Sequence, residues 1–411
     1  MREGFFRAVS TAEFRKLLRT FAPLPAETVD YDAALGRFLA GDVFAGEDLP
    51  AASRAAMDGY AVRAAEVFGA TETSPSYLDL AMDIPIGVLP EKPLAPGRCA
   101  RIVTGALLPD GADAVVMVEY TEDLGAGAIE IRRSVAPGDN MLFAGEDAAM
   151  GQRVLAAGTR LRPQELGVLA ALGQVLVTVG KRPSVAILST GDELVPATAT
   201  PKPGQIRDVN THTLAAMIAS AGGEPHPYPL VPDDLPGITA ALAKATAAHD
   251  LTLLSGGSSV GARDFTLDAL RGLGADILAH GVAISPGKPT ILANCGGRPV
   301  IGLPGQVTSA QVVMLVFGVP LLRHLAGDVA AFDRPVQTFP AILSRNIASK
   351  QGREDHVRVR LEPRPGQLPL AHPVLGKSGL LKTLLLADGL IVIPADLEGF
   401  AGEAEVAVRP I

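Results

Sequence analysis

The feature that most constrains the fold is a regular alternation of short apolar segments with helical segments between Arg182 and Leu325. Each apolar segment has the length of a buried strand, and a stretch of helical periodicity follows it. This alternation predicts a parallel sheet covered by helices on both faces. We expect strands at residues 185–189, 251–255 and 300–303, and helices at residues 210–221 (capped by Asn210), 233–249, 264–273 and 307–325.

The flanking regions have a different texture. Ser10 and Glu13 form a capping box at the start of a helix that Pro23 ends. Short apolar segments alternating with turns then indicate a small β-domain, inserted between two pieces of a helical one. Helices are expected at residues 32–39 and 163–173, inserted strands at 84–88, 100–103, 114–118 and 128–131, and strands of a C-terminal β-domain at 356–361, 390–393 and 405–408.

Charge and composition narrow the function classes. The 411 residues include 36 Lys and Arg against 44 Asp and Glu, a net charge of −8. General nucleic-acid and anionic-membrane surfaces need a basic face, so we expect neither partner, while a local anion site stays open. Cys99 and Cys295 form neither a disulfide framework nor a zinc spacing. Without an apolar leader or an uninterrupted membrane-spanning run, the sequence predicts a soluble cytoplasmic protein.

Ligands of open α/β sheets bind beyond the carboxyl ends of the strands, and three loops at such ends have unusual residues. The first has a glycine, Gly191, followed by the adjacent carboxylates Asp192 and Glu193; a solvated turn or a helix cap is the alternative interpretation. The second, residues 255–261, is a Gly/Ser-rich loop before a helix, which can cradle an anion with backbone amides. A plain flexible connection is its alternative.

The same loop matches the nucleophile-elbow pattern of α/β-hydrolases. Gly257, Ser259 and Gly261 fit the pattern, and Asp276 and His280 follow in hydrolase order. An elbow serine should lie directly on the strand-to-helix turn, whereas the apolar strand ends four residues before Ser259. We therefore keep hydrolysis only as a minor hypothesis.

A third loop places Lys288 between Pro286, Gly287 and Pro289, near the strand end that Pro304 and Gly305 follow. A lysine on a stiff loop can neutralise a phosphate or an oxyanion, although a solvated lysine is an equal alternative. Clustered carboxylates usually share a cation, and their hard oxygens suit Mg²⁺ beside phosphates. The carboxylates near these ends are Asp192, Glu193, Asp233 and Asp264, and they predict a Mg²⁺-assisted site for a phosphate-bearing ligand.

Together the motifs resemble those of the molybdopterin molybdenumtransferases, the MoeA family that includes the gephyrin E domain. They occur in family order over nearly the whole chain. The matching segments are Met57-Asp58-Gly59-Tyr60-Ala61, Thr104-Gly105-Ala106, Gly145-Glu146-Asp147, residues 189–194, Asp208-Val209-Asn210, residues 255–261, Pro286-Gly287-Lys288-Pro289, Leu303-Pro304-Gly305, Ser378-Gly379 and residues 387–390.

The resemblance implies an α/β multidomain architecture of four parts. These are a split helical domain (residues 1–49 and 146–181), an inserted β-rich domain (50–145), a molybdopterin-binding α/β domain with a parallel sheet (182–328) and a C-terminal β-barrel (329–411). It also implies a homodimer whose active site combines the α/β domain of one subunit with the inserted domain of the other. Such enzymes insert molybdate into adenylylated molybdopterin and release AMP in a Mg²⁺-dependent step. Molybdopterin adenylyltransferase and molybdoenzyme chaperones are further expected partners.

By resemblance, the catalytic candidates are Asp58, Thr104, Asp147, Glu193, Asp233, Asp264 and Lys288. The expected ligand-binding residues are Gly191, Ser255, Gly256, Gly257, Ser259, Gly261, Pro286, Gly287, Pro304, Gly305 and Ser378, and the expected metal ligands are Asp192, Glu193 and Asp264. The sequence departs from the family pattern at Ala52, Ala55, Ser285 and Lys377 and at residues 306–309, where Gln-Val-Thr-Ser replaces Asn-Pro-Val-Ser. These changes motivate an alternative, a non-catalytic molybdopterin-binding or scaffold paralogue.

Overall fold

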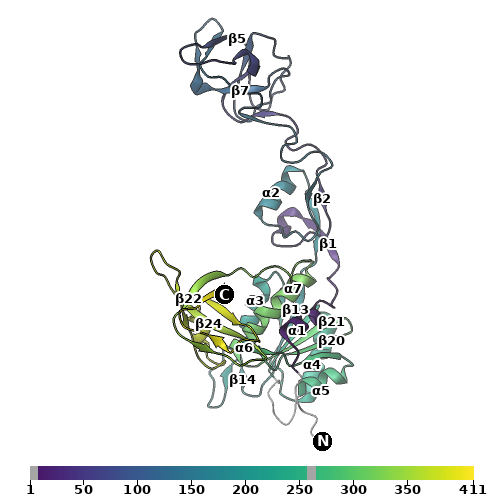
Figure 1. Cartoon of the computed structure of the whole chain (residues 1–411). Helices are drawn as coiled ribbons and strands as arrows, with labels where there is room; N and C mark the ends of the chain where they lie inside the picture. The colour runs from purple at the N-terminus through teal and green to yellow at the C-terminus, as the bar shows by residue number, and fades with distance from the viewer. Residues whose placement is uncertain (1–7, 257–264) are drawn as a thin grey trace. The chain divides into compact units, whose positions relative to one another are not determined.

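The computed structural model describes residues 8–256 and 265–411, in two compact units (Figure 1). The first unit consists of the chain up to Ala40, Gly158–Leu161 and Val177–Ile411, and the second of Gly41–Ala157 and Arg162–Leu176. This division is coarser than the four predicted parts, whose boundaries stay a prediction. Each unit is described by itself below.

The first unit is built on a six-stranded sheet of order β16-β13-β17-β21-β20-β18. Its first four strands run parallel, as predicted, whereas β20 runs antiparallel to both of its neighbours. Gly296 and Gly297, both at positive φ, make the two-residue hairpin turn from β20 to β21. In order across the sheet the strands are Glu224–Pro227, Ser184–Ser189, Leu251–Ser255, Arg298–Leu303, Ile291–Cys295 and Asp276–His280.

Helices cover both faces of this sheet, as expected. In β13, Val185 and Ile187 pack into one core, while Ala186 and Leu188 pack into the other. Both alternating sets of side chains are fully buried, which explains why this strand is apolar throughout. The first core includes residues of α1 (Thr11–Leu18), α3 (Asn210–Ser220), α6 (Val307–Val313) and α7 (Val319–Leu325), and the second those of α4 (Leu235–Ala248) and α5 (Phe265–Gly272).

The predicted helix at residues 307–325 is continuous but contains a π-helical turn at Met314–Gly318 between α6 and α7. Pro320 lies at the start of α7, where it lacks an amide donor and would crowd the preceding turn of a regular helix. By length and composition this is the one candidate membrane span in the described part of the chain. Because most of it is buried inside the protein, it has the character of a core helix.

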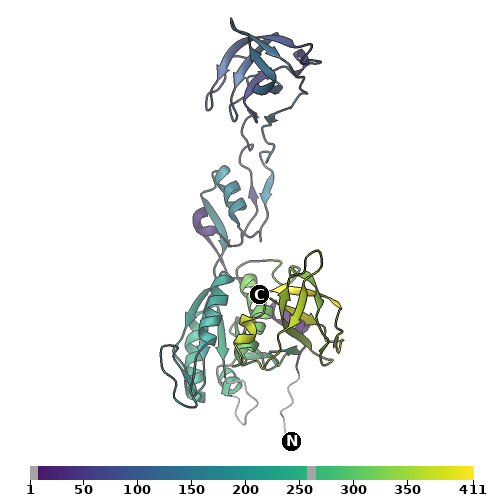
Figure 2. The same cartoon turned by 90° about the vertical axis from the view of Figure 1, so that its left-hand side faces the viewer.

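The C-terminal strands form the predicted barrel, which Figure 2 shows in yellow tones as a body beside the green α/β sheet. Pairing of β24 with β26 closes the ring β24-β25-β22-β28-β26, and β19 joins its outside. The strands are β19 (Ile284–Ser285), β22 (Phe339–Leu343), β24 (Glu354–Glu362), β25 (Leu370–Pro373), β26 (Gly389–Ile393) and β28 (Glu405–Pro410). Smaller elements of this unit are β1 (Ala26–Asp30), β12 (Leu176–Gly180), β14 (Leu194–Val195), β15 (Ile206–Arg207), β23 (Ile347–Ala348), α8 (Lys382–Leu385) and β27 (Gly399–Phe400).

The second unit contains a six-stranded sheet of order β7-β4-β6-β5-β9-β8. The strands are β4 (Gly59–Val62), β5 (Ser76–Ile84), β6 (Arg98–Ile102), β7 (Ala114–Met117), β8 (Thr121–Asp123) and β9 (Ala128–Ile131). Its other elements are β2 (Val43–Phe44) paired with β11 (Arg153–Leu155), β3 (Arg54–Ala55) paired with β10 (Met141–Leu142), and α2 (Pro163–Ala171). Cys99 in β6 is fully buried, and both cysteines are free, as expected.

Four local predictions were wrong. The helix that Pro23 was expected to end stops at Leu18, five residues earlier. The strand expected at residues 84–88 ends at Ile84, because Pro85 has no amide to pair and Gly87 turns at φ 77°. The helix expected at residues 32–39 is only a 3₁₀ turn, Tyr31–Ala34, because Leu35 already has an extended ψ of 127° and Gly36 turns away at φ 79°. Asn210 does not cap α3: Val209 occupies the cap position, and the Asn210 side chain makes other contacts.

Candidate active site

A cavity of about 1240 Å³ lies at the carboxyl ends of β13, β17 and β21. The loops after these three strands meet there, as the topology of a parallel sheet requires. The start of α3 and a loop of the C-terminal part complete the wall. The lining includes Thr190, Gly191, Glu193, Asp208, Asn210, Asp233, Ser255, Gly256, Pro289, Pro304, Gly305, Gln306, Ser309, Gly379 and Leu381.

Close backbone contact between the first two loops requires Gly256. A Cβ atom there would lie 2.1 Å from the Thr190 carbonyl oxygen, and its φ of 104° disfavours any L side chain. The Thr190 amide also donates to the Ser255 carbonyl at 3.0 Å. The ends of β13 and β17 are therefore held together at the floor of the cavity.

Asn210 ties the third loop to this floor. Its Nδ2 donates to Ser255 Oγ at 2.6 Å and to the Gly305 carbonyl at 2.9 Å. The side chain is 7% exposed, and its Oδ1 has no hydrogen-bond partner among the described residues. Asn210 thus leaves one acceptor unused in the wall of the cavity.

Two predicted carboxylates, Glu193 and Asp233, line the cavity. The Glu193 carboxylate folds back over Gly191, where a Cβ would lie 2.8 Å from Glu193 Oε2. Thr190 Oγ1 donates to Asp233 Oδ1 at 3.2 Å, and the Asp233 amide donates to Asp192 Oδ1 at 3.2 Å. The structure therefore gathers three of the four predicted carboxylates around one turn, although Asp192 does not line the cavity.

The Lys288 loop lies at the same edge of the sheet, because β20 starts where β21 ends: Ile291 pairs with Gly302. Pro289 lines the cavity, and Lys288 is exposed beside it. Gly287, at φ 131°, packs tightly against α6, since a Cβ would lie 2.5 Å from Val313 Cγ2. Lys288, Pro286 and Gly287 are not themselves in the cavity wall.

The C-terminal part reaches the cavity through the Ser378 loop. The Ser378 carbonyl accepts the Thr308 amide at 3.0 Å, and the next residue, Gly379, lines the cavity. Ser378 is therefore adjacent to the site through its backbone. Gly257, Ser259, Gly261 and Asp264 lie outside the described residues.

In the second unit, Asp58 and Thr104 form a direct pair. Asp58 Oδ1 accepts the Thr104 amide at 2.6 Å and the Thr104 hydroxyl at 2.8 Å. These hydrogen bonds, the backbone one first, hold the pKa of Asp58 below its ordinary value. Asp147 is exposed in the same unit, and its amide donates to the Leu49 carbonyl at 2.9 Å.

Comparison with known proteins matches three consecutive family models to the chain. They are the MoeA N-terminal region (domain I and II) at residues 9–173, a probable molybdopterin binding domain at 186–324 and the MoeA C-terminal region (domain IV) at 340–411. The chain belongs to the MoeA family. The predicted resemblance and enzyme class, molybdopterin molybdenumtransferase, are confirmed.

Relatives of similar length support this membership. A molybdopterin molybdenumtransferase of Bacillus subtilis is 33% identical over 93% of this chain and 89% of the relative. Molybdopterin molybdenumtransferase 2 of Mycobacterium tuberculosis is 36% identical over 96% of each chain. The crystal structure of the molybdopterin biosynthesis MoeA protein of Pyrococcus horikoshii OT3 matches 98% of this chain and 100% of its own, with 32% identity and a TM-score of 0.84.

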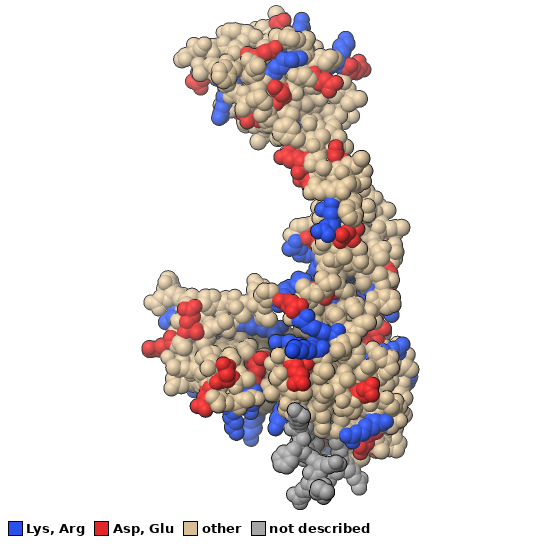
Figure 3. All heavy atoms as spheres, turned by 45° about the vertical axis from the view of Figure 1, so that its right-hand side comes forward, with Lys and Arg blue, Asp and Glu red and all other residues tan. Residues whose placement is uncertain are grey.

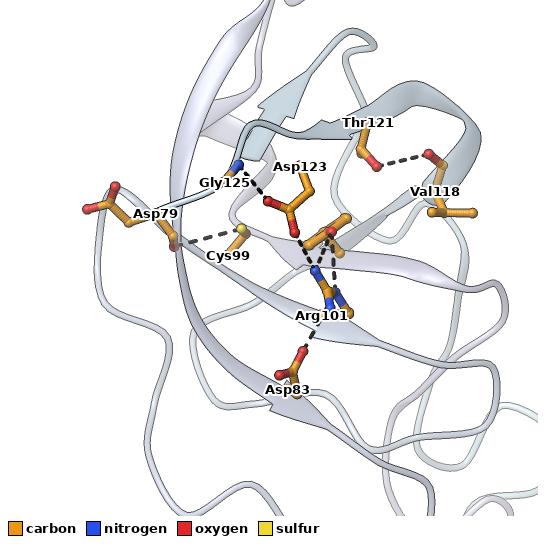
Figure 4. A network of polar contacts seen from close by, with 9 residues as sticks. Asp79, Asp83, Cys99, Arg101, Val118, Thr121, Asp123 and Gly125 are labelled. Carbon is orange, nitrogen blue, oxygen red and sulfur yellow. Dashed lines mark hydrogen bonds and ion pairs between the residues drawn. The ribbon is translucent and has the colours of Figure 1, made fainter. Parts of the chain in front are cut away.

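In this MoeA chain, the strand register brings Asp58 and Thr104 together, and a polar network around Arg101 lies on the same sheet (Figure 4). Arg101 in β6 is the register partner of Tyr60 in β4, so the residues just beyond them, Thr104 and Asp58, lie at the same end of the antiparallel pair. Arg101 donates to the Tyr60 hydroxyl at 3.3 Å and to Asp123 at 2.8 Å, and it lies 3.6 Å from Asp83. The bond to Tyr60, first, and the acidic neighbours raise the pKa of the guanidinium, so it stays charged.

Sequence reasoning missed Arg207 and Asn210 as cavity residues. Arg207, in β15, lines the cavity and donates from Nε to the Ala199 carbonyl at 3.0 Å. It lies next to the Asp208-Val209-Asn210 motif, which was the available sign. Arg207 also supplies the cavity wall with a positive charge. On the face of the molecule that Figure 3 shows, by contrast, positive and negative side chains are interspersed.

The described residues could supply only some of the ligands of a Mg²⁺ ion. Among the described residues no three His, Cys, Asp or Glu side chains converge as a metal site, and Asp264 is outside them. Mg²⁺ beside phosphates commonly takes only one or two carboxylates, with phosphate oxygens and waters as the other ligands. Glu193 and Asp233 in the cavity wall meet that requirement.

The hydrolase residues are not assembled by the sheet. Asp276 and His280 lie at opposite ends of β18, and β18 is separated from β17 by β21 and β20. The Ser259 loop itself is outside the described residues. No described feature therefore favours the hydrolase hypothesis over the family.

Proposed function

We propose that this chain inserts molybdate into adenylylated molybdopterin and releases AMP, in a Mg²⁺-dependent step. The observation that supports this most is the cavity, in a MoeA-family chain, in which Glu193 and Asp233 face backbone loops at three strand ends. Its volume of about 1240 Å³ exceeds that of an ordinary small-molecule pocket and suits a pterin joined to a nucleotide. Adenylylated molybdopterin, the substrate expected for the family, is such a molecule.

The residues divide the work by their chemistry. Gly256 lets the strand-end loops approach a ligand closely, and Asn210 braces Ser255 and Gly305 in the cavity wall. Arg207 and Lys288 neutralise the pyrophosphate or molybdate. Glu193 and Asp233 would hold Mg²⁺, which offsets the negative charge that develops on the leaving phosphate. Asp192, Asp264 and the Gly/Ser-rich loop at residues 255–261 remain proposed contributors.

The central test is AMP release by Glu193→Gln with adenylylated molybdopterin, molybdate and Mg²⁺. We expect a loss of about 100-fold or more, because an electrostatic contact to the reacting group is removed. The melting temperature should not change, since Glu193 is exposed. Glu405→Gln, at an exposed position of β28, is the matched control and should release AMP as the parent does. Normal release by Glu193→Gln would refute the assignment.

The non-catalytic alternative rests on the Gln306 change. Gln306 lines the cavity and is the cap residue of α6, but its side chain makes no capping bond. If the parent protein binds adenylylated molybdopterin without releasing AMP, this alternative is correct. Recovery of release in Gln306→Asn/Val307→Pro would then identify the loop as the cause.

We further propose a cytoplasmic homodimer, in which Asp58, Thr104 and Asp147 of one copy act with the cavity of the other. Mixing Glu193→Gln with Asp58→Asn tests this. If sites are shared, mixed dimers contain one intact site, so random exchange restores about a quarter of parental activity. No recovery after verified subunit exchange would show that each chain acts alone. Binding to molybdopterin adenylyltransferase and to molybdoenzyme chaperones is a matching expectation for pull-down measurements.

A further inference from the structure

A second, smaller cavity of about 260 Å³ lies in the first unit, at the far end of α3 from Asn210. Because α3 has 11 residues, its two ends are about 16 Å apart. A ligand here cannot occupy the substrate cavity as well. The lining consists of Leu35, Gly36, Arg37, Phe38, Arg160, Gly180, Arg182, Ala219, Ser220, Ala221, Gly222 and Ala326. We call this cavity the arginine pocket.

Three separate segments each contribute an arginine to the lining: Arg37, Arg160 and Arg182. Arg323 of α7 adds a fourth positive charge close enough to feel the field of Arg160. Burial, first, and the fields of Arg160 and Arg334 lower the pKa of Arg323, and the field of Asp328 opposes them. Basic residues so placed repel one another. A common anion would relieve that repulsion.

The acidic residues near the arginine pocket do not neutralise its positive charge. Glu27 pairs with Arg37, and Asp328 pairs with Arg334 at 3.0 Å. Among the residues that the structure describes, Arg160 and Arg182 form no ion pair. The carboxyl end of α3 contributes roughly half a negative charge, which offsets only part of the excess. The surroundings of the pocket are therefore net positive.

Donor groups at the pocket are also incompletely used. Arg37 is 8% exposed; its Nη2 donates to Glu27 and to the Gly180 carbonyl, the latter at 2.8 Å. Its Nε is shut off from solvent and has no partner among the described residues. A buried donor without a partner is costly, so the protein itself satisfies the Arg37 guanidinium only in part.

We propose that the arginine pocket binds a tetrahedral oxyanion, either a free ion or the phosphate of a nucleotide, independently of the substrate cavity. Planar guanidinium groups match two oxygens of such an anion at once. A volume of about 260 Å³ holds one phosphate group and leaves no room for a whole pterin nucleotide. Inorganic phosphate, molybdate and AMP share this chemistry and are the three sources to distinguish.

The test is calorimetric titration of the full chain with each of these three probes. We expect one phosphate per chain, with affinity that falls as salt rises. Arg160→Gln/Arg182→Gln should weaken that binding about tenfold or more for each arginine removed. Molybdate and AMP can also enter the substrate cavity, so only a preference for one of them that Arg160→Gln/Arg182→Gln removes would name the source. Arg98→Gln, at an exposed arginine of β6, is the matched control and should bind as the parent does.

Activity and stability separate this proposal from the proposed function. Arg160→Gln/Arg182→Gln should release AMP at the parental rate, because neither arginine lines the substrate cavity. If the double variant does not fold, the single variant Arg160→Gln still tests the proposal, because the Arg160 side chain is exposed and its loss should not disturb folding. Phosphate binding unchanged in both variants would overturn the proposal. So would the absence of saturable binding of all three probes below about 10 mM in the parent.

Discussion

Gly256→Ala is the sharpest test of how the site is built. The added Cβ would lie 2.1 Å from the Thr190 carbonyl oxygen, 3.1 Å from its carbonyl carbon and 3.2 Å from its Cγ2. Two of these atoms are backbone, so no side-chain rotation relieves the contact. One of the two strand ends must move by about 1 Å to restore ordinary contact distances. The hydrogen bond from the Thr190 amide to the Ser255 carbonyl would break first.

The expected cost has two parts. An L residue held at φ 104° costs about 1–3 kcal/mol, and overpacking against backbone costs about 1–3 kcal/mol more. Gly256→Ala should therefore destabilise the protein by about 2–6 kcal/mol. Because Thr190 leads into the Gly191–Glu193 turn, AMP release should fall as well, even where the protein stays folded. Urea unfolding and the AMP assay measure the two effects.

Gly272→Ala is the control, because α5 ends at Gly272, its φ is not positive, and a Cβ there meets nothing within 4 Å. That substitution should stabilise the protein by about 0.4–1 kcal/mol, since alanine restricts the unfolded chain. The reasoning is refuted if Gly256→Ala unfolds at the same urea concentration as Gly272→Ala. Equal AMP release by the two variants would separately refute the link to Glu193.

Three further outcomes follow from specific contacts. Asn210→Ala removes two hydrogen bonds and should cost about 1–3 kcal/mol in urea unfolding; a cost below about 0.5 kcal/mol would contradict its bracing role. Thr104→Val removes one of the two donors that lower the pKa of Asp58, so carbon-13 NMR titration should find that pKa raised part of the way to its ordinary value, with an unchanged pKa as the contrary result. Glu165→Gln should lose less than about 1 kcal/mol at pH 7, because the partner Arg162 is exposed. Hydrogen bonds from Arg162 lower the pKa of Glu165 from 4.5 to about 2, so this loss should be full above pH 4.5 and vanish as the pH falls through about 2; a loss independent of pH would exclude the ion pair as its source.

The strand-end loops could be predicted because buried parallel strands have an unmistakable sequence. β13 and β17 are apolar on both faces, and the residues that follow them change abruptly to Gly, Ser and acidic types. Sheet topology then brings together loops that are far apart in the chain. Glu193, Asp233, Ser255 and Gly305 were found in this way, and all of them line the cavity.

The remaining features depend on tertiary contacts that no local pattern reports. The sequence Gly296-Gly297 was a sign of a hairpin, yet a strand–helix interpretation hid the antiparallel β20. Asn210 has the composition of a helix cap, but its amide is used across the sheet by Ser255 and Gly305, 45 and 95 residues away. The Asp58–Thr104 pair likewise depends on strand register, which neither residue's neighbours encode.

The two cavities at the ends of α3 fit one electrostatic arrangement. A helix is positive at its amino end and negative at its carboxyl end, each by roughly half a charge. The amino end of α3 begins at Asn210 in the substrate cavity, where it favours a pyrophosphate, and the carboxyl end faces Arg160 and Arg182. The helix end therefore offsets part of the repulsion among those arginines before any anion binds, by about 0.3–1 kcal/mol for each arginine. Removing them should change stability by a fixed amount when no anion is present, whereas an occupied arginine pocket adds a loss that grows with phosphate concentration. The dependence on phosphate, and not the loss itself, therefore distinguishes a binding site from a helix-end charge pair.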